Sequence, residues 1–388
     1  MILAYATSSA AREAQIVVVG WQVYEITKDP LALGLIGLAE ALPFIAVALY
    51  AGHVADRSNR KAIAVAGTFG LLLSAIALLG FTLMHMTSVW PIYAVIFLSG
   101  IGRSFTRPAV TALSAELVPR EIYSNAVAWR SSTWQFAAVF GPAVGGLLYG
   151  FAGPAAAYGV VCVFMMISLA AMAWIRHDEQ PRGQQDIPVG ESLRIGLRFV
   201  WNEPVVLAAM TLDLFAVLFG GAAALLPIFA RMLGAGPEGL GVLRAAPAIG
   251  SFFVGVYLAH RPPFRRAGIT LFVCVAMFGM CIIAFALSRN FYLSLALLTL
   301  SGMADQISVV IRGTLIQVAT PTHLLGRVSA VNQIFIGSSN EIGAFESGVA
   351  ARLMGTVPSV IFGGVMTLIV VATTAIFSPR LRKLRELT

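Results

Sequence analysis

The sequence predicts an all-α membrane protein with twelve transmembrane helices in two six-helix repeats. The chain of 388 residues is 58% hydrophobic and only 11% charged, with a mean hydropathy of +0.85, whereas soluble domains carry roughly 25% charged residues. Apolar runs of about 20 residues, each long enough to cross a hydrocarbon core of about 30 Å as a helix, recur along the whole sequence. The runs are continuous rather than alternating, so helices and not a β-barrel are expected.

Short turns, most of them containing Gly or Pro, join the predicted spans. The spans cover residues 2–26, 33–52, 62–84, 91–114, 124–150, 154–175, 204–231, 237–259, 267–287, 291–318, 326–354 and 357–378. One long polar connection, 176–203, divides the chain. The predicted domains are therefore an N-terminal six-helix bundle at 1–175, a C-terminal six-helix bundle at 204–378 and a basic tail at 379–388.

This long connection has two parts. The first is rich in charged and amide side chains, and we expect a flexible cytoplasmic linker there. The second places Leu193, Leu197 and Val200 on one face with Arg194 and Arg198 beside them. That pattern indicates a short helix lying in the membrane interface. A solvated linker throughout is the alternative.

Short segments of the first half recur in the second half. Leu98-Ser99-Gly100 returns as Leu300-Ser301-Gly302, and Val118-Pro119 is echoed by Thr320-Pro321 at the same offset. Ala55-Asp56-Arg57 is echoed by Ala259-His260-Arg261 at nearly that offset. A shared offset near half the chain length favours a parallel repeat, with the binding site expected between the repeats near the middle of the membrane.

The net charge of +8 would favour nucleic acid as a partner in a soluble protein, but here the basic residues gather at one set of loops. The face that we predict to be cytoplasmic holds Arg57, Arg60, Lys61, Arg120, Arg176, Arg182, Arg194, Arg198, Arg261, Arg265, Arg266, Arg327, Arg380, Arg382, Lys383 and Arg385. The other face holds Lys28, Arg231, Arg289 and Arg352. By the positive-inside rule both termini are cytoplasmic, and the charge faces lipid headgroups rather than nucleic acid.

No pattern in the sequence points to an enzyme, a metal or another cofactor. No His pair has metal-ligand spacing, no Gly-x-Ser-x-Gly occurs, and Gly100-Ile101-Gly102 lies inside an apolar span rather than after a strand. Cys162, Cys274 and Cys281 lie in apolar runs, so we expect them to pack; the last two are about 10 Å apart along a helix, too far for a disulfide. No basic leader precedes the first span, so no cleavable signal peptide is expected.

Charged side chains inside the spans are the main functional candidates, because such charges are costly unless they face a cavity or each other. A carboxylate near an arginine can gain and lose a proton as hydration and pairing change between two conformations. Glu13, Asp213 and Asp305 are the predicted proton or cation sites, with Arg12 and Arg103 as counter-charges. The full predicted proton-coupling and substrate cavity consists of Arg12, Glu13, Glu40, Arg103, Asp213, Arg244, Asp305 and Glu341.

Other charges have a plainer interpretation. Arg107, Arg130 and Arg312 lie nearer the predicted span ends, and we expect their side chains to reach the interface. Glu346 follows Glu341 by five residues on one helix, so the two cannot both face the cavity. For the whole set, the alternative is that the ion pairs only hold helices together.

The run 52–61 is the densest polar stretch in the first half of the chain and is predicted to be a loop. It matches, at Gly52, Asp56, Arg57, Arg60 and Lys61, the pattern Gly-x-x-x-Asp-Arg-x-Gly-Arg-Arg/Lys. The match resembles the signature between the second and third helices of the major facilitator superfamily, with Asn59 at its glycine; Asn also visits left-handed conformations. The resemblance implies a conformational latch in which Asp56 meets the N-terminus of the span at 326–354, where a carboxylate gains about 0.3–1 kcal/mol.

The span at 124–150 contains Gly141, Pro142, Gly145 and Gly146. Small residues allow close approach of helices, and the proline removes one helix hydrogen bond. The stretch resembles the superfamily's proton-antiporter signature Gly-x-x-x-Gly-Pro-x-x-Gly-Gly, with Ala137 at the first glycine. Many drug exporters also have an arginine four residues before the position of Gly100; Ile96 stands there, so Arg103 does not simply inherit that proton relay.

Four further segments resemble the enterobactin-exporter-like branch of the superfamily; they lie at 21–34, 226–231, 236–241 and 339–348. The resemblance covers essentially the whole chain. It implies a monomeric secondary transporter of the bacterial cytoplasmic (inner) membrane that works by alternating access and exports a small amphipathic molecule, such as a siderophore or drug, in exchange for protons. Uptake or lipid flipping by the same fold, and a membrane sensor that moves nothing, are the alternatives.

Overall fold

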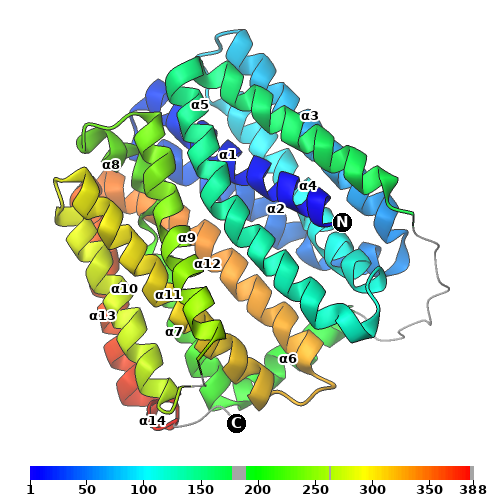
Figure 1. Cartoon of the computed structure of the whole chain (residues 1–388). Helices are drawn as coiled ribbons and strands as arrows, with labels where there is room; N and C mark the ends of the chain where they lie inside the picture. The colour runs from blue at the N-terminus through cyan, green and yellow to red at the C-terminus, as the bar shows by residue number, and fades with distance from the viewer. Residues whose placement is uncertain (177–188, 262–263, 385–388) are drawn as a thin grey trace. The chain divides into compact units, whose positions relative to one another are not determined.

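The computed structural model describes residues 1–176, 189–261 and 264–384; within these ranges the side chains at 48–49, 52–53, 55–57, 120, 124, 189 and 192 lie outside the description. Every regular element of the described residues is a helix (Figure 1). The predicted all-α class is therefore confirmed. The chain separates into two compact units, Met1–Asp186 with Gly234–Ala245, and Ile187–Leu233 with Ala246–Thr388.

The first unit is built from long helices that pack side by side. Its elements are α1 (Ile2–Thr27), α2 (Pro30–Arg57), α3 (Arg60–Leu83), α4 (Trp90–Glu116), the short 3₁₀ turn η1 (Arg120–Ile122), α5 (Tyr123–Trp174) and the first part of α9 (Pro237–Ala259). α5 packs along α1 and α3, while α4 packs along α2 and α3. Small residues such as Ala11, Ala14 and Ala75 are buried in the core and let the helix backbones approach closely.

Local sequence signals set several helix boundaries. Asp29 caps α2 by accepting a hydrogen bond from the Leu31 amide at 3.0 Å, and Asn59 caps α3 through the Ala62 amide at 2.7 Å. α2 runs on to Arg57, so the predicted loop at 52–61 is helical except at Ser58 and Asn59. The expectation of a loop was wrong, because the helical backbone of α2 continues through these polar residues to Arg57. It ends only just before Asn59, which caps α3.

α5 consists of two helices that meet at a kink, and these hold two of the predicted spans. Gly153 adopts φ 83° and ψ 170°, a conformation that only glycine reaches readily, and Pro154 follows it. The chain turns at this point, as the turn signal at 150–154 predicts.

The second unit contains the remaining helices. They are α6 (Val189–Asn202), α7 (Pro204–Gly220), η2 (Ala222–Leu225), α8 (Leu226–Met232), the rest of α9, α10 (Ala267–Leu287), α11 (Phe291–Ala319), α12 (Leu325–Met354), α13 (Thr356–Phe377) and α14 (Pro379–Arg382). α7 packs against α12 and α13, and α10 packs against α11 and α13. α14 lies in the predicted basic tail, where Leu381 is buried in the core of this unit.

The predicted single span at 204–231 is broken in the structure. α7 ends at Gly220, Gly221 leaves helical geometry, and η2 and α8 follow. The hydroxyl of Ser347 on α12 donates a hydrogen bond of 3.1 Å to the freed carbonyl of Gly221. A backbone break at membrane depth requires such a partner, because lipid offers none.

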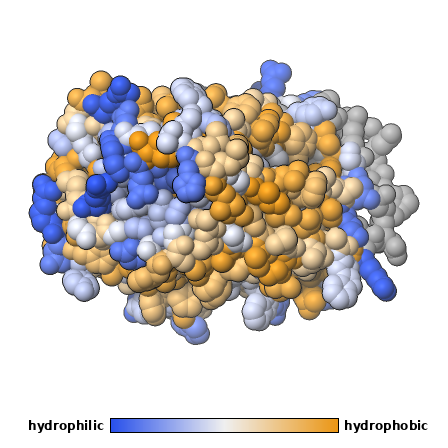
Figure 2. Space-filling view, turned by 90° about the horizontal axis from the view of Figure 1, so that it is seen from above, coloured by the Kyte–Doolittle hydropathy of each residue, from blue (hydrophilic) through white to orange (hydrophobic). Residues whose placement is uncertain are grey.

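Within the described residues, eight helical segments are long and apolar enough to cross a membrane, with α5 counted once over Asn125–Trp174 and α7 to α8 counted once over Pro204–Met232. α1, α4 and α12 are not among the eight; they hold the intramembrane charges Arg12, Glu13, Arg103, Arg107, Glu341 and Glu346. All twelve predicted spans fall on helical segments, although the number of membrane crossings stays a prediction. Figure 2 shows hydrophobic residues over much of the visible face, the surface that lipid requires.

One packing feature occurs once in each unit. A Cβ on Gly100 would lie 2.6 Å from Pro43 of α2, and a Cβ on Gly302 would meet Pro247 of α9. Gly100 and Gly302 are the repeated glycines of the two Leu-Ser-Gly segments. The repeated glycine therefore has the same packing role in both units. Gly100 lets α4 approach the proline-containing α2, and Gly302 lets α11 approach the proline-containing α9.

Candidate functional site

Four of the predicted charges meet in the first unit. Arg12 of α1 donates a hydrogen bond of 3.0 Å to Glu40 of α2, and Arg103 of α4 forms an ion pair with the same carboxylate oxygen. Glu13 lies 3.6 Å from Arg12. The side chains of Glu13 and Glu40 are only 15% and 14% exposed, so both acids are largely withdrawn from solvent. Two arginines and two glutamates from three helices thus form one connected network.

More positive charge lies near this network. Arg107 of α4 is within electrostatic range of Arg12, Arg103 and Arg130, and the Arg130 guanidinium lies 6.0 Å from the ring centre of Tyr5. Four arginines and two glutamates are therefore grouped among the spans of this unit. A grouping of arginines of this kind attracts an anionic group.

The glycine motif of α5 sets the position of Glu13. A Cβ on Gly141 would lie 2.7 Å from both the Ala10 carbonyl oxygen and the Glu13 Cβ, and a Cβ on Gly145 would lie 2.8 Å from the Ala14 carbonyl oxygen. α1 and α5 are thus in backbone contact at the charge network. The glycine motif of α5 and the charged residue Glu13, which the sequence analysis singled out separately, are therefore in direct contact.

The next glycine of the motif faces α9 instead. A Cβ on Gly146 would lie 2.5 Å from the Pro237 carbonyl oxygen, and one on Gly241 would meet the Pro142 carbonyl oxygen. The motif therefore joins three helices of the first unit, with α5 between α1 and the first turns of α9.

A polar network further along α1 was not among the predicted site residues. Tyr149 donates a hydrogen bond of 2.6 Å to Glu25, and Tyr158 donates one of 2.7 Å to Gln22. Gln22 in turn donates one of 3.0 Å to Thr82 of α3. Gln22 and Glu25 were the available signal in the sequence. They were passed over because polar residues near the end of an apolar run are normally taken to mark the end of the span.

The second charged cluster lies in the second unit. Asp213 of α7 forms an ion pair with Arg312 of α11, and both residues are buried, at 8% and 7% exposed. The expectation that Arg312 reaches the interface was therefore wrong. Its buried partner holds the guanidinium inside the helix bundle, because breaking such a pair leaves an uncompensated charge.

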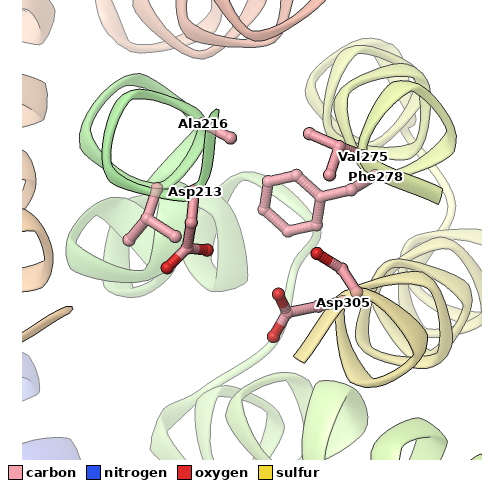
Figure 3. Close-up of a pocket in the computed structure, with 7 residues that line it drawn as sticks. Asp213, Ala216, Val275, Phe278 and Asp305 are labelled. Carbon is pink, nitrogen blue, oxygen red and sulfur yellow. The ribbon is translucent and has the colours of Figure 1, made fainter. Parts of the chain in front are cut away.

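Asp213 and Asp305 share a small cavity (Figure 3). Asp213 comes from α7 and Asp305 from α11, and their carboxylates face the same space, while Val275 and Phe278 of α10 close one side. The cavity has room for about one water molecule. Asp305 has no hydrogen bond or ion pair with another described residue, in contrast to Asp213.

Ser308 belongs to the same cavity and was missed by sequence reasoning. It is 2% exposed, and its hydroxyl has no hydrogen-bond partner among the described residues. Ser308 follows Asp305 by three residues and Arg312 follows it by seven, so all three share one face of α11. That spacing was the available signal, but a serine in an apolar span carries no hydropathy cue.

The remaining predicted residues lie outside these contacts or outside the description. Arg244 on α9 and Glu341 on α12 are half-buried, and each has an interaction with another group. Gly52, Asp56 and Arg57 are on α2, but their side chains are among those not described, so the Asp56 latch stays a prediction. Arg60 forms an ion pair of 2.5 Å with Glu116 at the end of α4, and Lys61 is half-buried beside it in sequence.

The comparisons with known proteins decide the family. The family model described as transmembrane secretion effector matches residues 2–387. The chain belongs to this family. Transmembrane secretion effectors are transporters of the major facilitator superfamily, so the predicted fold and the prediction that the chain is not an enzyme are confirmed.

Relatives of this transmembrane secretion effector include proteins named enterobactin exporter EntS. That of Shigella boydii serotype 18 is 25% identical over 94% of this chain and 88% of the relative, and that of Escherichia coli O1:K1 / APEC is 26% identical over the same shares. Two solved structures of a bacterial homologue of the human lysosomal transporter Spinster, both inward-facing, share the fold. The occupied form gives a TM-score of 0.68 at 16% identity, covering 97% of this chain and 98% of that one, and the unoccupied form gives 0.64 at 14%, covering 98% of each.

Proposed function

We propose that this transporter exports a small amphipathic molecule in exchange for protons, by alternating access, across the bacterial cytoplasmic membrane. The relatives named enterobactin exporter support export of a siderophore-like or drug-like molecule. The charged clusters inside the spans support coupling to protons, because intramembrane carboxylates mark proton pathways.

The observation that carries the proposal is the contrast between Asp213 and Asp305. Arg312 compensates the charge of Asp213, whereas Asp305 faces the same cavity with no cationic partner among the described residues. An ionised carboxylate is expensive to keep in such a place, and a bound proton removes the charge. Asp305 would therefore take up a proton from one side of the membrane and release it when the cavity opens to the other.

The first unit supplies the substrate side of the proposal. Arg12 and Arg103 meet there among the spans, and they are the proposed partners of an anionic or zwitterionic molecule. Glu13, held against α5 by Gly141, is the second proposed proton site. In this scheme a proton and a cationic group of a zwitterionic substrate compete for the Glu13 carboxylate, so binding of one releases the other, which couples the two movements in opposite directions.

The remaining parts of the proposal concern topology and partners. Both termini are placed in the cytoplasm, the chain acts as a monomer in the lipid bilayer, and the α2–α3 region acts as the latch. Accessibility of single cysteines introduced at exposed Ser58 and at Arg289 would test the orientation, because the proposal puts these positions on opposite sides of the membrane. Labelling of both from the same side would contradict it.

Transport by purified protein in proteoliposomes tests the coupling. With enterobactin as the first probe, an imposed pH gradient should drive its accumulation by wild type, and Glu13→Gln and Asp305→Asn should each lose this dependence. Glu121→Gln is the matched control, because Glu121 is exposed in η1 and outside both clusters. Wild-type coupling in both cluster variants would overturn the proposed sites.

Oriented membrane vesicles separate the alternatives. Everted membrane vesicles should accumulate an exported probe, whereas an uptake carrier would accumulate it only in right-side-out vesicles. A lipid flippase would move a fluorescent phospholipid between leaflets, and a sensor would bind its ligand without any flux.

A further inference from the structure

α6 has two faces of different character. On the inner face, Gly196 lies so close to α12 that a Cβ would be 2.8 Å from the Arg327 carbonyl oxygen, and Val200 is completely buried. Val200 packs with Val206 of α7 and Val328 of α12 in one hydrophobic cluster. These contacts fix the rotation of α6 about its own axis, so its other face is held outward.

The outer face combines charge with large apolar side chains. Arg194, Leu197, Arg198 and Trp201 are all exposed and are spaced as one stripe along the helix. Leu197 is 45% exposed and Trp201 is 71% exposed. An open hollow runs along this stripe and is lined by the same four residues and Asn202. We call these four residues the α6 stripe.

The α6 stripe lies next to a membrane-spanning segment. Only Glu203 separates the end of α6 at Asn202 from Pro204, where the apolar span Pro204–Met232 begins. The end of α6 that carries Trp201 therefore lies at the depth where the span enters the bilayer. Tryptophan is enriched at this depth, and an amphipathic helix with leucine and tryptophan beside arginine binds there.

The charge of the stripe favours one kind of lipid. Arg194 and Arg198 make no ion pair with another described residue, and the acid on the helix, Glu191, lies one turn earlier without pairing with them. Arginine presents a rigid fork of N–H donors that matches phosphate oxygens. We infer that the α6 stripe is a binding site for the headgroup of an anionic phospholipid, with the phosphate on the two arginines and the glycerol and upper acyl chain on Leu197 and Trp201.

Fluorescence quenching in nanodiscs tests this site with the full chain. The probes are brominated phosphatidylglycerol and brominated phosphatidylcholine at equal mole fraction. The fluorescence of Trp201 is obtained as the difference between the emission of wild type and that of Trp201→Phe. The anionic probe should quench Trp201 more strongly than the zwitterionic one. Removing both charges in Arg194→Gln/Arg198→Gln should weaken this preference by roughly fivefold for each arginine, from about 1 kcal/mol per basic residue.

Two further variants keep the inference falsifiable. Arg265→Gln/Arg266→Gln removes the same charge from exposed positions before α10 and should leave the Trp201 preference unchanged. Arg194→Lys/Arg198→Lys keeps the charge but loses the fork of N–H donors, so it should retain only part of the preference. Equal quenching by the two lipids, no quenching by either, or an equal loss in the Arg265→Gln/Arg266→Gln control would each overturn the site.

Discussion

Replacing Gly141 with alanine should damage transport through helix packing alone. The new methyl group would lie 2.7 Å from the Ala10 carbonyl oxygen and 2.7 Å from the Glu13 Cβ. Ordinary contact begins near 3.4 Å, so α1 and α5 must separate by about 0.7 Å at this point. Overpacking of this kind costs about 1–3 kcal/mol. The same movement shifts α1 relative to α2, and with it the hydrogen bond of 3.0 Å from Arg12 to Glu40.

Gly159→Ala is the matched control for this variant. Gly159 lies in the second helix of α5, beyond the kink at Gly153, and a Cβ there has no neighbour within 4 Å. An alanine at that position should be neutral or stabilising by up to about 1 kcal/mol, because glycine is a poor helix former. In Gly141→Ala, the unfolding temperature in detergent and the rate of pH-gradient-driven transport should both fall. In Gly159→Ala, neither should fall. Equal stability and equal transport of the two variants would refute the proposed role of the α1–α5 contact.

Three other predictions follow from the Asp213–Arg312 ion pair, the Tyr149–Glu25 hydrogen bond and the α2–α3 region. Arg312→Leu should destabilise the fold by about 3–5 kcal/mol, because it leaves the Asp213 charge buried and unpaired, and thermal unfolding should show that adding Asp213→Leu recovers most of the loss. Tyr149→Phe should cost about 1.5–3 kcal/mol, the value of a hydrogen bond to a charged group such as Glu25, and an unchanged unfolding temperature would argue against that bond. Asp56→Asn should leave the protein folded but slow turnover, and wild-type flux at normal expression would count against a latch.

Much of the fold could be predicted because lipid imposes one rule on every span. A run of about 20 apolar residues has to be helical, so the helical segments could be placed without tertiary information. The break after α7 was missed because hydropathy stays high through Gly220 and Gly221, and the run looks continuous. The paired glycines were the local signal for a break, but the carbonyl they free is satisfied by Ser347, more than a hundred residues away.

The candidate site was only partly predictable for a different reason. The sequence shows which charges lie within spans, but it does not show which ones pair. Arg312 was judged by its distance from the end of its helix, whereas its burial depends on Asp213 of α7. Ser308 and Tyr149 are neutral, so they became visible only when the fold placed them beside Asp305 and Glu25.

The central claim is that Asp305 carries a proton during the transport cycle. The most direct measurement follows proton movement with a pH-sensitive dye inside proteoliposomes while substrate flux is recorded in the same vesicles. We predict that wild type moves protons when the substrate moves, and that Asp305→Asn still exchanges substrate at equal pH but moves no protons. Substrate-dependent proton movement of wild-type size in Asp305→Asn would contradict the account.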